Sequence, residues 1–130
     1  MSLNDPLSNA MSKINNHEKV GKKECTIKPV SKIIKKVLDI LNEEGYLGKY
    51  EDIEDGKGNH IKLNLLSSIN KCGAVKPRFA VGVDNYEKFE KRYLPSRGFG
   101  LLVVSTAQGI MSHEKAKEKK IGGRLIAYCY

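Results

Sequence analysis

The chain has 130 residues, enough for one domain or for two small halves that share a core. Hydrophobic residues make up 40% and charged residues 29%, which is typical of a globular protein and not of a disordered or collagenous one. No apolar run approaches the roughly 20 residues that span a bilayer, and the first residues lack the layout of a secretion signal. A cytosolic protein without a membrane partner is expected.

The net charge of +8 is unevenly distributed along the chain. Residues 1–36 carry 8 Lys and Arg against 3 Asp and Glu, residues 37–66 carry 3 against 7, and residues 67–130 carry 12 against 5. Two basic ends around an acidic middle indicate a polyanion that is held at two places. Charge alone does not separate nucleic acid from an anionic membrane, but no segment has the lysine-flanked apolar face of a membrane-surface helix.

Neither a metal site nor a cofactor site is predicted. The three cysteines are widely separated and form no Cys-x-x-Cys pair, so buried free thiols are expected in place of zinc ligands or disulfides. The sequence has no phosphate loop and no dinucleotide fingerprint. The histidines lie in three different elements without metal-ligand spacing. These residues are Cys25, Cys72, Cys129, His17, His60 and His113.

Residues 1–66 predict the order helix, strand, helix, strand, strand. The first helix begins at Pro6 with Asp5 as its N-cap, and its polar face carries Lys13 among Asn and Ser side chains that suit sugar and phosphate contacts as well as solvent. A strand follows over 24–28. Ser31 caps a second helix that ends at Gly45, and its apolar stripe is Ile33, Ile34, Val37, Leu38 and Leu41.

The second helix and the hairpin that follows it carry opposite charges. Lys32, Lys35 and Lys36 in the first turns of the helix are interpreted as placed for a partner, with a solvated face as the alternative. Residues 46–54 and 59–66 predict a hairpin around the turn 55–58. The acidic tip of this hairpin, which is expected to face away from a polyanion, consists of Glu51, Asp52, Glu54 and Asp55.

Residues 67–76 are interpreted as a connector, and residues 77–130 as a second half. A short strand over 79–83 precedes a helix capped by Asp84, and the continuous apolar run 101–104 predicts a strand buried on both faces. A helix over 113–120 capped by Ser112 and a final strand over 124–130 complete the half. The fold class is therefore α+β, with two small packed halves, the second mostly antiparallel strands with short helices.

The aromatic stripe of the helix after Asp84 has two interpretations. Tyr86, Phe89 and Tyr93 recur at spacings of three and four, so they form one face. That face packs against the sheet or, alternatively, stacks bases or docks another protein, which would make the chain a protein–protein adaptor.

A small polar turn follows the buried strand: Ser105-Thr106-Ala107-Gln108-Gly109-Ile110-Met111-Ser112. Its hydroxyls, carboxamide and glycine offer donors and acceptors with little bulk, and lysines follow. This chemistry fits the sugar edges, phosphates and exposed bases of structured RNA. A hydrolase with Ser105 as nucleophile is the enzyme alternative, but His113 and Glu114 nearby do not complete a catalytic constellation.

The same turn resembles the Ser-Thr-Ser-x-Gly-x-Met-Thr signature of the eighth protein of the small ribosomal subunit. The motifs Lys-Pro-Arg-Phe at 76–79, Arg-Tyr-Leu-Pro at 92–95 and Gly-Gly-Arg-Leu-Ile-Ala-Tyr at 122–128 resemble its archaeal and eukaryotic branch. Asp-Pro-Leu at 5–7 and Pro-Val-Ser-Lys at 29–32 match its N-terminal half. The resemblance spans nearly the whole chain.

The resemblance implies a non-catalytic ribosomal protein with two α/β halves. Members of the family bind a hairpin in the central domain of small-subunit ribosomal RNA early in assembly, lie beside other small-subunit proteins, and commonly repress their own messenger RNA. In this chain Ser105 and Thr106 would contact RNA, Gln108 and Gly109 would shape the approach, and Lys32 would contact the backbone. The full set of expected RNA-binding residues is Ser105, Thr106, Gln108, Gly109, Lys32, Lys13, Ser112, Gly122 and Arg124.

Two residues depart from the family pattern. Ala107 stands where the signature usually has serine, so one hydroxyl contact is missing. Arg124 stands where bacterial relatives tend to have glutamate, so a carboxylate contact to a base does not transfer. A guanidinium there can contact a phosphate in its place.

Overall fold

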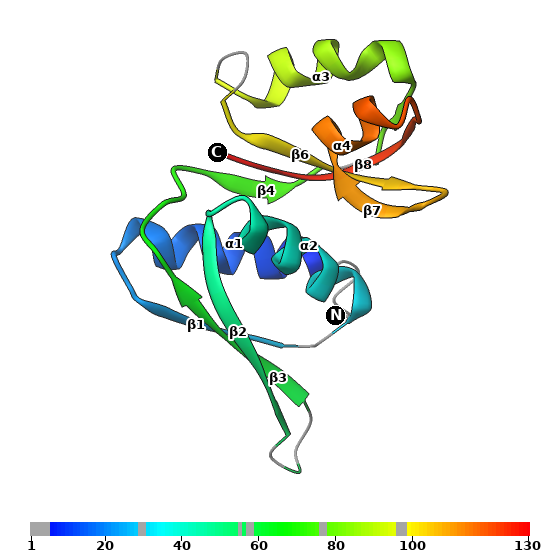
Figure 1. The fold of residues 1–130 in the computed structure, drawn as a ribbon. Coiled ribbons are helices and arrows are strands. Elements are labelled where there is room, and N and C mark those ends of the chain that lie inside the picture. Colours follow the sequence, from blue (N-terminus) through cyan, green and yellow to red (C-terminus); the bar gives the residue numbers. More distant parts are fainter. Residues whose placement is uncertain (1–5, 29–30, 55, 57–58, 76–77, 96–98) are drawn as a thin grey trace.

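A computed structural model describes residues 6–28, 31–54, 56, 59–75, 78–95 and 99–130. These residues form helices and two antiparallel sheets, which confirms the predicted α+β class (Figure 1). The helices are α1 (Pro6–Lys19), α2 (Lys32–Glu43), the 3₁₀ turn η1 (Val83–Asn85), α3 (Tyr86–Tyr93) and α4 (His113–Glu118). The strands are β1 (Glu24–Ile27), β2 (Leu47–Glu54), β3 (Asn59–Leu65), β4 (Cys72–Ala74), β5 (Ala80–Val81), β6 (Leu101–Thr106), β7 (Gly109–Ser112) and β8 (Gly123–Cys129).

The first half forms as its periodicity predicts. The strands β1, β3 and β2 pair in that order into an antiparallel sheet, and alternate residues of β3 point into the core. Ser31 Oγ accepts a hydrogen bond from Ile34 N at 3.3 Å, which confirms the predicted N-cap of α2. The predicted apolar faces are buried except for Ile33, which is half-buried: they comprise Leu7, Ala10, Met11, Ile14, Ile34, Val37, Leu38 and Leu41.

Helices α1 and α2 lie between the two sheets (Figure 1). One face of α1 contacts β1 of the first sheet, and another contacts β4 of the second. A single hydrophobic cluster accordingly joins residues of both halves, including Ile14 of α1, Leu63 of β3 and Val103 of β6. The three cysteines are free and buried, as predicted, and all belong to this cluster. The halves therefore share a core.

The second sheet is covered on both faces. Its strands run in the order β4-β8-β6-β7, with β5 also paired to β8. Leu101 and Val103 of β6 belong to the cluster formed with α1 and α2, whereas Leu102 and Val104 belong to the cluster that contains Tyr86 of α3. This is why residues 101–104 are apolar at every position.

The segment predicted as a connector includes a strand of the second sheet. β4 pairs with the end of β8, and α1 binds the segment through three polar contacts. Cys72 N donates to Asn15 Oδ1 at 3.3 Å, Cys72 Sγ donates to the carbonyl of Met11 at 3.5 Å, and Ile69 N donates to Glu18 Oε2 at 3.2 Å. The composition of residues 67–76 gave no sign of this strand, because it is only three residues long.

Several predicted boundaries in the second half were wrong. The strand over 79–83 is limited to β5, and residues 83–85 form η1. Asp84 is therefore inside η1, and Asn85 is the residue that precedes α3. The final strand covers residues 123–129, and α4 ends at Glu118. Two residues later, Lys120 has a left-handed φ of 57°. The predicted cap Asp5 and most of the turn 55–58 lie outside the described residues. None of the helices that the structure describes has the length and apolarity needed to cross a membrane.

We expect Met11→Ala to lower the free energy of unfolding of both halves together. Met11 is 1% exposed and its carbonyl contacts Cys72 of the second sheet. Truncation of a buried methionine leaves a cavity that costs about 2–5 kcal/mol. Urea unfolding should therefore show a lower midpoint, with amide exchange in β3 and β8 accelerated alike. Accelerated exchange confined to α1 and β3 would contradict a shared core, and Val83→Ala at an exposed position is the control.

Candidate nucleic-acid interface

The predicted polar turn is the tip of a hairpin. Strands β6 and β7 pair up to Thr106 and Gly109, so only Ala107 and Gln108 form the turn. Ala107, Gln108 and Gly109 are exposed, while Ser105 and Thr106 are half-buried. Gly109 has a φ of +116°, which a residue with a side chain rarely adopts. The sequence missed β7, because four residues with a glycine at the start give no clear alternation.

Hydrogen bonds within the hairpin fix the shape of the tip. Thr106 Oγ1 donates to the carbonyl of Gly109 at 2.7 Å and accepts from Gln108 N at 3.1 Å. Lys119 Nζ donates to Gln108 Oε1 at 3.4 Å, which links the tip to the segment after α4. The hydroxyl proton of Thr106 is thus used inside the protein, and the backbone at the tip is presented in a fixed form.

A hydroxyl and a guanidinium lie side by side next to the tip. Ser105 is paired with Ile110 of β7 on one side and with Arg124 of β8 on the other. Directly opposed residues of an antiparallel pair project to the same face of the sheet. Arg124 is exposed and Ser105 half-buried, so both can reach one ligand. The 18 residues between them in the sequence hide this neighbourhood from sequence reasoning.

Two glycines allow the backbone to pass close to neighbouring strands. A Cβ on Gly123 would lie 2.2 Å from the carbonyl oxygen of Ser105, and one on Gly122 would lie 2.4 Å from the carbonyl oxygen of Val81. Such distances exclude a side chain without movement of the backbone. Gly122, expected at the RNA surface, therefore has a role inside the protein, in holding the start of β8 against β5.

The expected site residue Ser112 is buried. It is 3% exposed, and its hydroxyl accepts a hydrogen bond from Lys115 N at 3.4 Å as the predicted N-cap of α4. Ser112 thus lies at the junction of β7 and α4, where its hydroxyl caps the helix.

His113 belongs to a buried polar network. Its Nδ1 accepts a hydrogen bond from Leu102 N at 3.0 Å, and its Nε2 lies 2.9 Å from Glu90 Oε1, which also binds Lys117 Nζ. Because Nδ1 is an acceptor, Nε2 carries the proton of a neutral ring. Desolvation lowers the pKa of His113 and the charge of Lys117 lowers it further, while Glu90 opposes them.

This geometry does not support the two alternative functions. Both ring nitrogens of His113 are occupied inside the protein, so this histidine is not a base for Ser105. Tyr86 and Phe89 are 1% and 6% exposed, so the predicted aromatic stripe packs on the sheet and is not a docking surface for an adaptor.

Among the described residues no group of three or more His, Cys, Asp or Glu is arranged to hold a metal ion.

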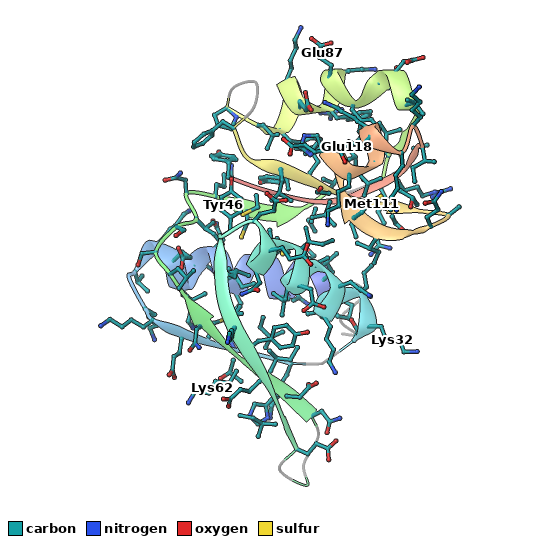
Figure 2. All side chains as sticks on the ribbon, in the orientation of Figure 1. Lys32, Tyr46, Lys62, Glu87, Met111 and Glu118 are labelled. Atoms are coloured by element: carbon teal, nitrogen blue, oxygen red, sulfur yellow. The ribbon has the colours of Figure 1, made fainter. Side chains whose placement is uncertain are left out.

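The lysines of the first half that were expected to contact a partner lie on α1 and α2 and have different surroundings. Lys32 is exposed at the start of α2, on the side of the molecule towards which the β6–β7 hairpin projects (Figures 1 and 2). Lys13 is exposed on α1, and its charge opposes the rise that burial causes in the pKa of the Cys25 thiol. Lys13 therefore lies towards β1. Lys35, interpreted as available to a partner, forms an ion pair of 2.5 Å with Asp52 of β2.

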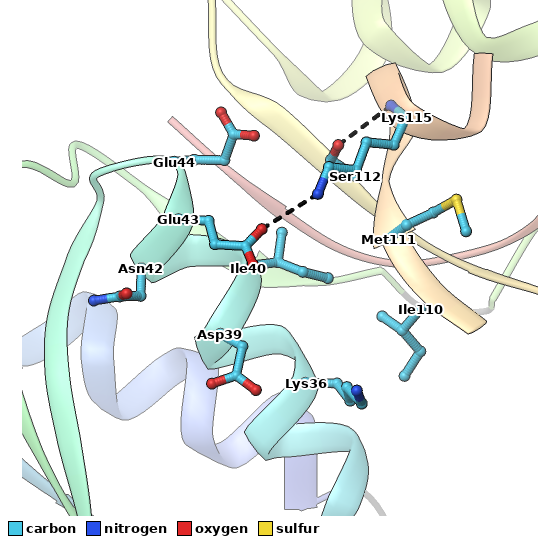
Figure 3. Close-up of a pocket in the computed structure, with 10 residues that line it drawn as sticks. All are labelled: Lys36, Asp39, Ile40, Asn42, Glu43, Glu44, Ile110, Met111, Ser112 and Lys115. Atoms are coloured by element: carbon cyan, nitrogen blue, oxygen red, sulfur yellow. Dashed lines mark hydrogen bonds and ion pairs between the residues drawn. The ribbon is translucent and has the colours of Figure 1, made fainter. Parts of the chain in front are cut away.

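A groove of about 290 Å³ separates α2 from β7 and the start of α4 (Figure 3). Lys115 Nζ crosses it to Glu43 Oε2 at 3.3 Å, an exposed pair that adds little stability but links the halves. One end of the groove holds Lys36 and Ile110, so it opens beside the hairpin. Its lining residues are Lys36, Asp39, Ile40, Asn42, Glu43, Glu44, Ile110, Met111, Ser112 and Lys115.

We expect the His113 network to make the protein less stable in acid. The unfolded chain protonates this histidine near pH 6.5, whereas the folded protein resists protonation to a lower pH. Its stabilisation is therefore complete above about pH 6.5 and is lost as the pH falls below that value, with a slope of at most about 1.4 kcal/mol per pH unit. Urea midpoints at a series of pH values would measure this loss.

His113→Gln should reduce the acid-side slope of these urea midpoints. Equal slopes for wild type and His113→Gln would show that another group titrates.

The comparison with known families agrees with this geometry. A family model described as ribosomal protein S8 matches residues 5–130, which is nearly the whole chain and includes both halves and the hairpin. The family consists of structural, RNA-binding proteins of the small ribosomal subunit, which act in translation as part of the cytoplasmic ribosome. The chain belongs to the ribosomal protein S8 family.

Proposed function

We propose that this protein binds a hairpin in the central domain of small-subunit ribosomal RNA and so helps the subunit to assemble. The observation that carries the proposal is the common orientation of two distant parts of the chain. The exposed tip of the β6–β7 hairpin and the start of α2 with Lys32 lie on one side of the molecule (Figures 1 and 2). One RNA can therefore contact both at once.

Binding proceeds in two stages. The excess of lysine and arginine attracts the RNA at long range, and this attraction is independent of sequence. The narrow tip then enters an irregular part of the RNA, where exposed backbone groups and hydroxyls contact sugar edges and bases. The fixed hydrogen bonds of Thr106 reduce the ordering cost of this second stage.

The individual residues have different tasks in this proposal. Ser105 and Arg124 contact the RNA directly, Arg124 through a phosphate. Gln108 and Gly109 present the tip, and Thr106 holds its shape. Lys32 and Lys13 contact the phosphate backbone, Lys32 from α2 and Lys13 from α1. Ser112 and Gly122 position α4 and β8 and act through other residues.

The same surface accounts for feedback on the protein's own messenger RNA. A tip that recognises the shape of one RNA hairpin binds the same shape in another RNA. If the messenger contains such a hairpin, it competes with ribosomal RNA for the single site between Lys32 and the tip. Displacement of the labelled ribosomal hairpin by the messenger leader tests this, and a lack of competition at saturating leader would remove the regulatory part of the proposal.

We expect Thr106→Val to weaken binding of the ribosomal RNA hairpin by about 1–3 kcal/mol. The valine keeps the shape of the side chain but removes the bonds to Gly109 and Gln108, so the tip loses its fixed form. Thr106→Ser retains the hydroxyl and should bind as wild type does. Dissociation constants from filter binding measure both variants, and a wild-type constant for the valine variant would count against the proposal.

We expect Lys32→Ala to weaken binding to matched and mismatched RNA hairpins alike. A lysine that contacts phosphate carries no sequence information, and its loss should reduce the slope of log K against log salt by about one charge. Lys49→Ala, at another exposed lysine, on β2, is the matched control and should leave the slope unchanged. A loss that is confined to the matched hairpin would contradict a backbone role.

A further inference from the structure

A row of aromatic rings lies at the far end of the second sheet from the hairpin. Phe99 contacts Tyr130 with ring centroids 6.5 Å apart, Tyr130 stacks on Tyr128 at 6.4 Å, and Tyr128 stacks on Tyr93 at 5.5 Å. We call Phe99, Tyr130, Tyr128 and Tyr93 the aromatic ladder. Its inner rings are half-buried and cover one another, whereas Phe99 is 46% exposed. The ladder therefore presents one open ring on a rigid support.

Cations lie at both ends of the aromatic ladder. The guanidinium of Arg92 lies 4.9 Å from the ring centroid of Phe79 and 5.5 Å from that of Tyr93, so it is held between two aromatic side chains. Lys71 exchanges backbone hydrogen bonds with Tyr130, which places their side chains on the same face. Within the described part of the chain neither Arg92 nor Lys71 forms an ion pair, so their charges face solvent.

The position of the ladder separates it from the proposed hairpin site. β6 begins at Leu101, next to Phe99, and ends at Thr106 in the hairpin, while β8 runs in the opposite direction towards Tyr130. Six residues of strand place the two surfaces roughly 20 Å apart. Figure 1 shows them at opposite ends of the second sheet. One RNA hairpin on the tip of β6–β7 would leave the ladder uncovered.

We propose that the aromatic ladder is a second RNA contact, which binds a single-stranded segment by stacking a base on Phe99 while Arg92 and Lys71 contact its phosphates. An open aromatic ring beside cations is the arrangement that binds single-stranded nucleic acid with little sequence preference. Because both surfaces are built on β6 and β8, the protein acts as a strut between two RNA elements. This proposal extends the proposed function but does not require the identity of the hairpin.

The charges favour RNA over a protein segment as the occupant. An apolar protein anchor would use the exposed ring equally well, but it would leave Arg92 and Lys71 desolvated without partners. Phosphate groups satisfy both cations, and the planar guanidinium offers two parallel donors to one phosphate. The ring must then act through its aromatic face and not only through its apolar volume.

The test measures binding of the full chain to a fluorescein-labelled oligouridylate of roughly a dozen nucleotides by fluorescence anisotropy. Phe99→Leu keeps an apolar side chain but removes the aromatic face, and should weaken binding by at least about five-fold. Phe99→Tyr keeps the ring and should bind as wild type does. Arg92→Gln should weaken binding and lower its salt dependence. Because Phe99 and Arg92 are exposed, thermal unfolding should be unchanged in each variant.

Further binding measurements distinguish the aromatic ladder from the hairpin site. Prior saturation with the ribosomal RNA hairpin should leave oligouridylate affinity unchanged, and Phe99→Leu should bind the hairpin as tightly as wild type. Lys32→Ala should leave oligouridylate binding unaltered. Displacement of the oligouridylate by the hairpin, or wild-type affinity in Phe99→Leu as an apolar protein contact predicts, would overturn the proposal. Failure of the hairpin to bind wild type would overturn only the proposed function.

Discussion

The burial of the second sheet on both faces is the constraint on which the rest of the molecule depends. Its inner face is covered by α1 and α2 and its outer face by α3 and α4, so β6 is apolar throughout residues 101–104. Because helices of the first half supply one of these covers, the halves cannot rotate freely against each other. A fixed angle between them is what allows Lys32 and the β6–β7 hairpin to face one partner.

Rigidity also characterises the tip itself. Thr106 bonds to both Gln108 and Gly109, and Lys119 holds the carboxamide of Gln108. A loop that recognises folded RNA by shape gains from such internal bonds, because little conformational entropy remains to be lost on binding. These bonds give the threonine of the signature a role in fixing the shape of the tip, and in the proposed function the direct contact belongs to Ser105 beside Arg124.

Acidic residues of the middle segment, 37–66, pair with lysines from both halves of the folded protein. Asp52 binds Lys35, and Glu43 binds Lys115, so part of this charge holds the chain's own cations. These pairs are exposed and contribute little to stability. One effect is on the first turns of α2, where Lys35 is half-buried and paired with Asp52, whereas Lys32 and Lys36 are exposed.

Local physical chemistry made much of the fold predictable from the sequence. The periodicity of α1 and α2, the caps Ser31 and Ser112, and the doubly buried strand follow from interactions within a few residues, and the polar signature at 105–112 identified the family. The short strands β4 and β7 were missed and the bounds of β5 were wrong, because pairing with other strands defines these elements and no local pattern does.

Only the tertiary structure decided which residues meet. The pairing of Ser105 with Arg124, the contact of His113 with Glu90 and the ladder from Phe99 to Tyr93 join residues that the sequence separates. Strand register and the packing of helices on a shared core set these neighbourhoods. Sequence by itself determined the longer elements and the family, whereas the arrangement of the side chains in the proposed RNA site required the long-range packing that brings both halves together.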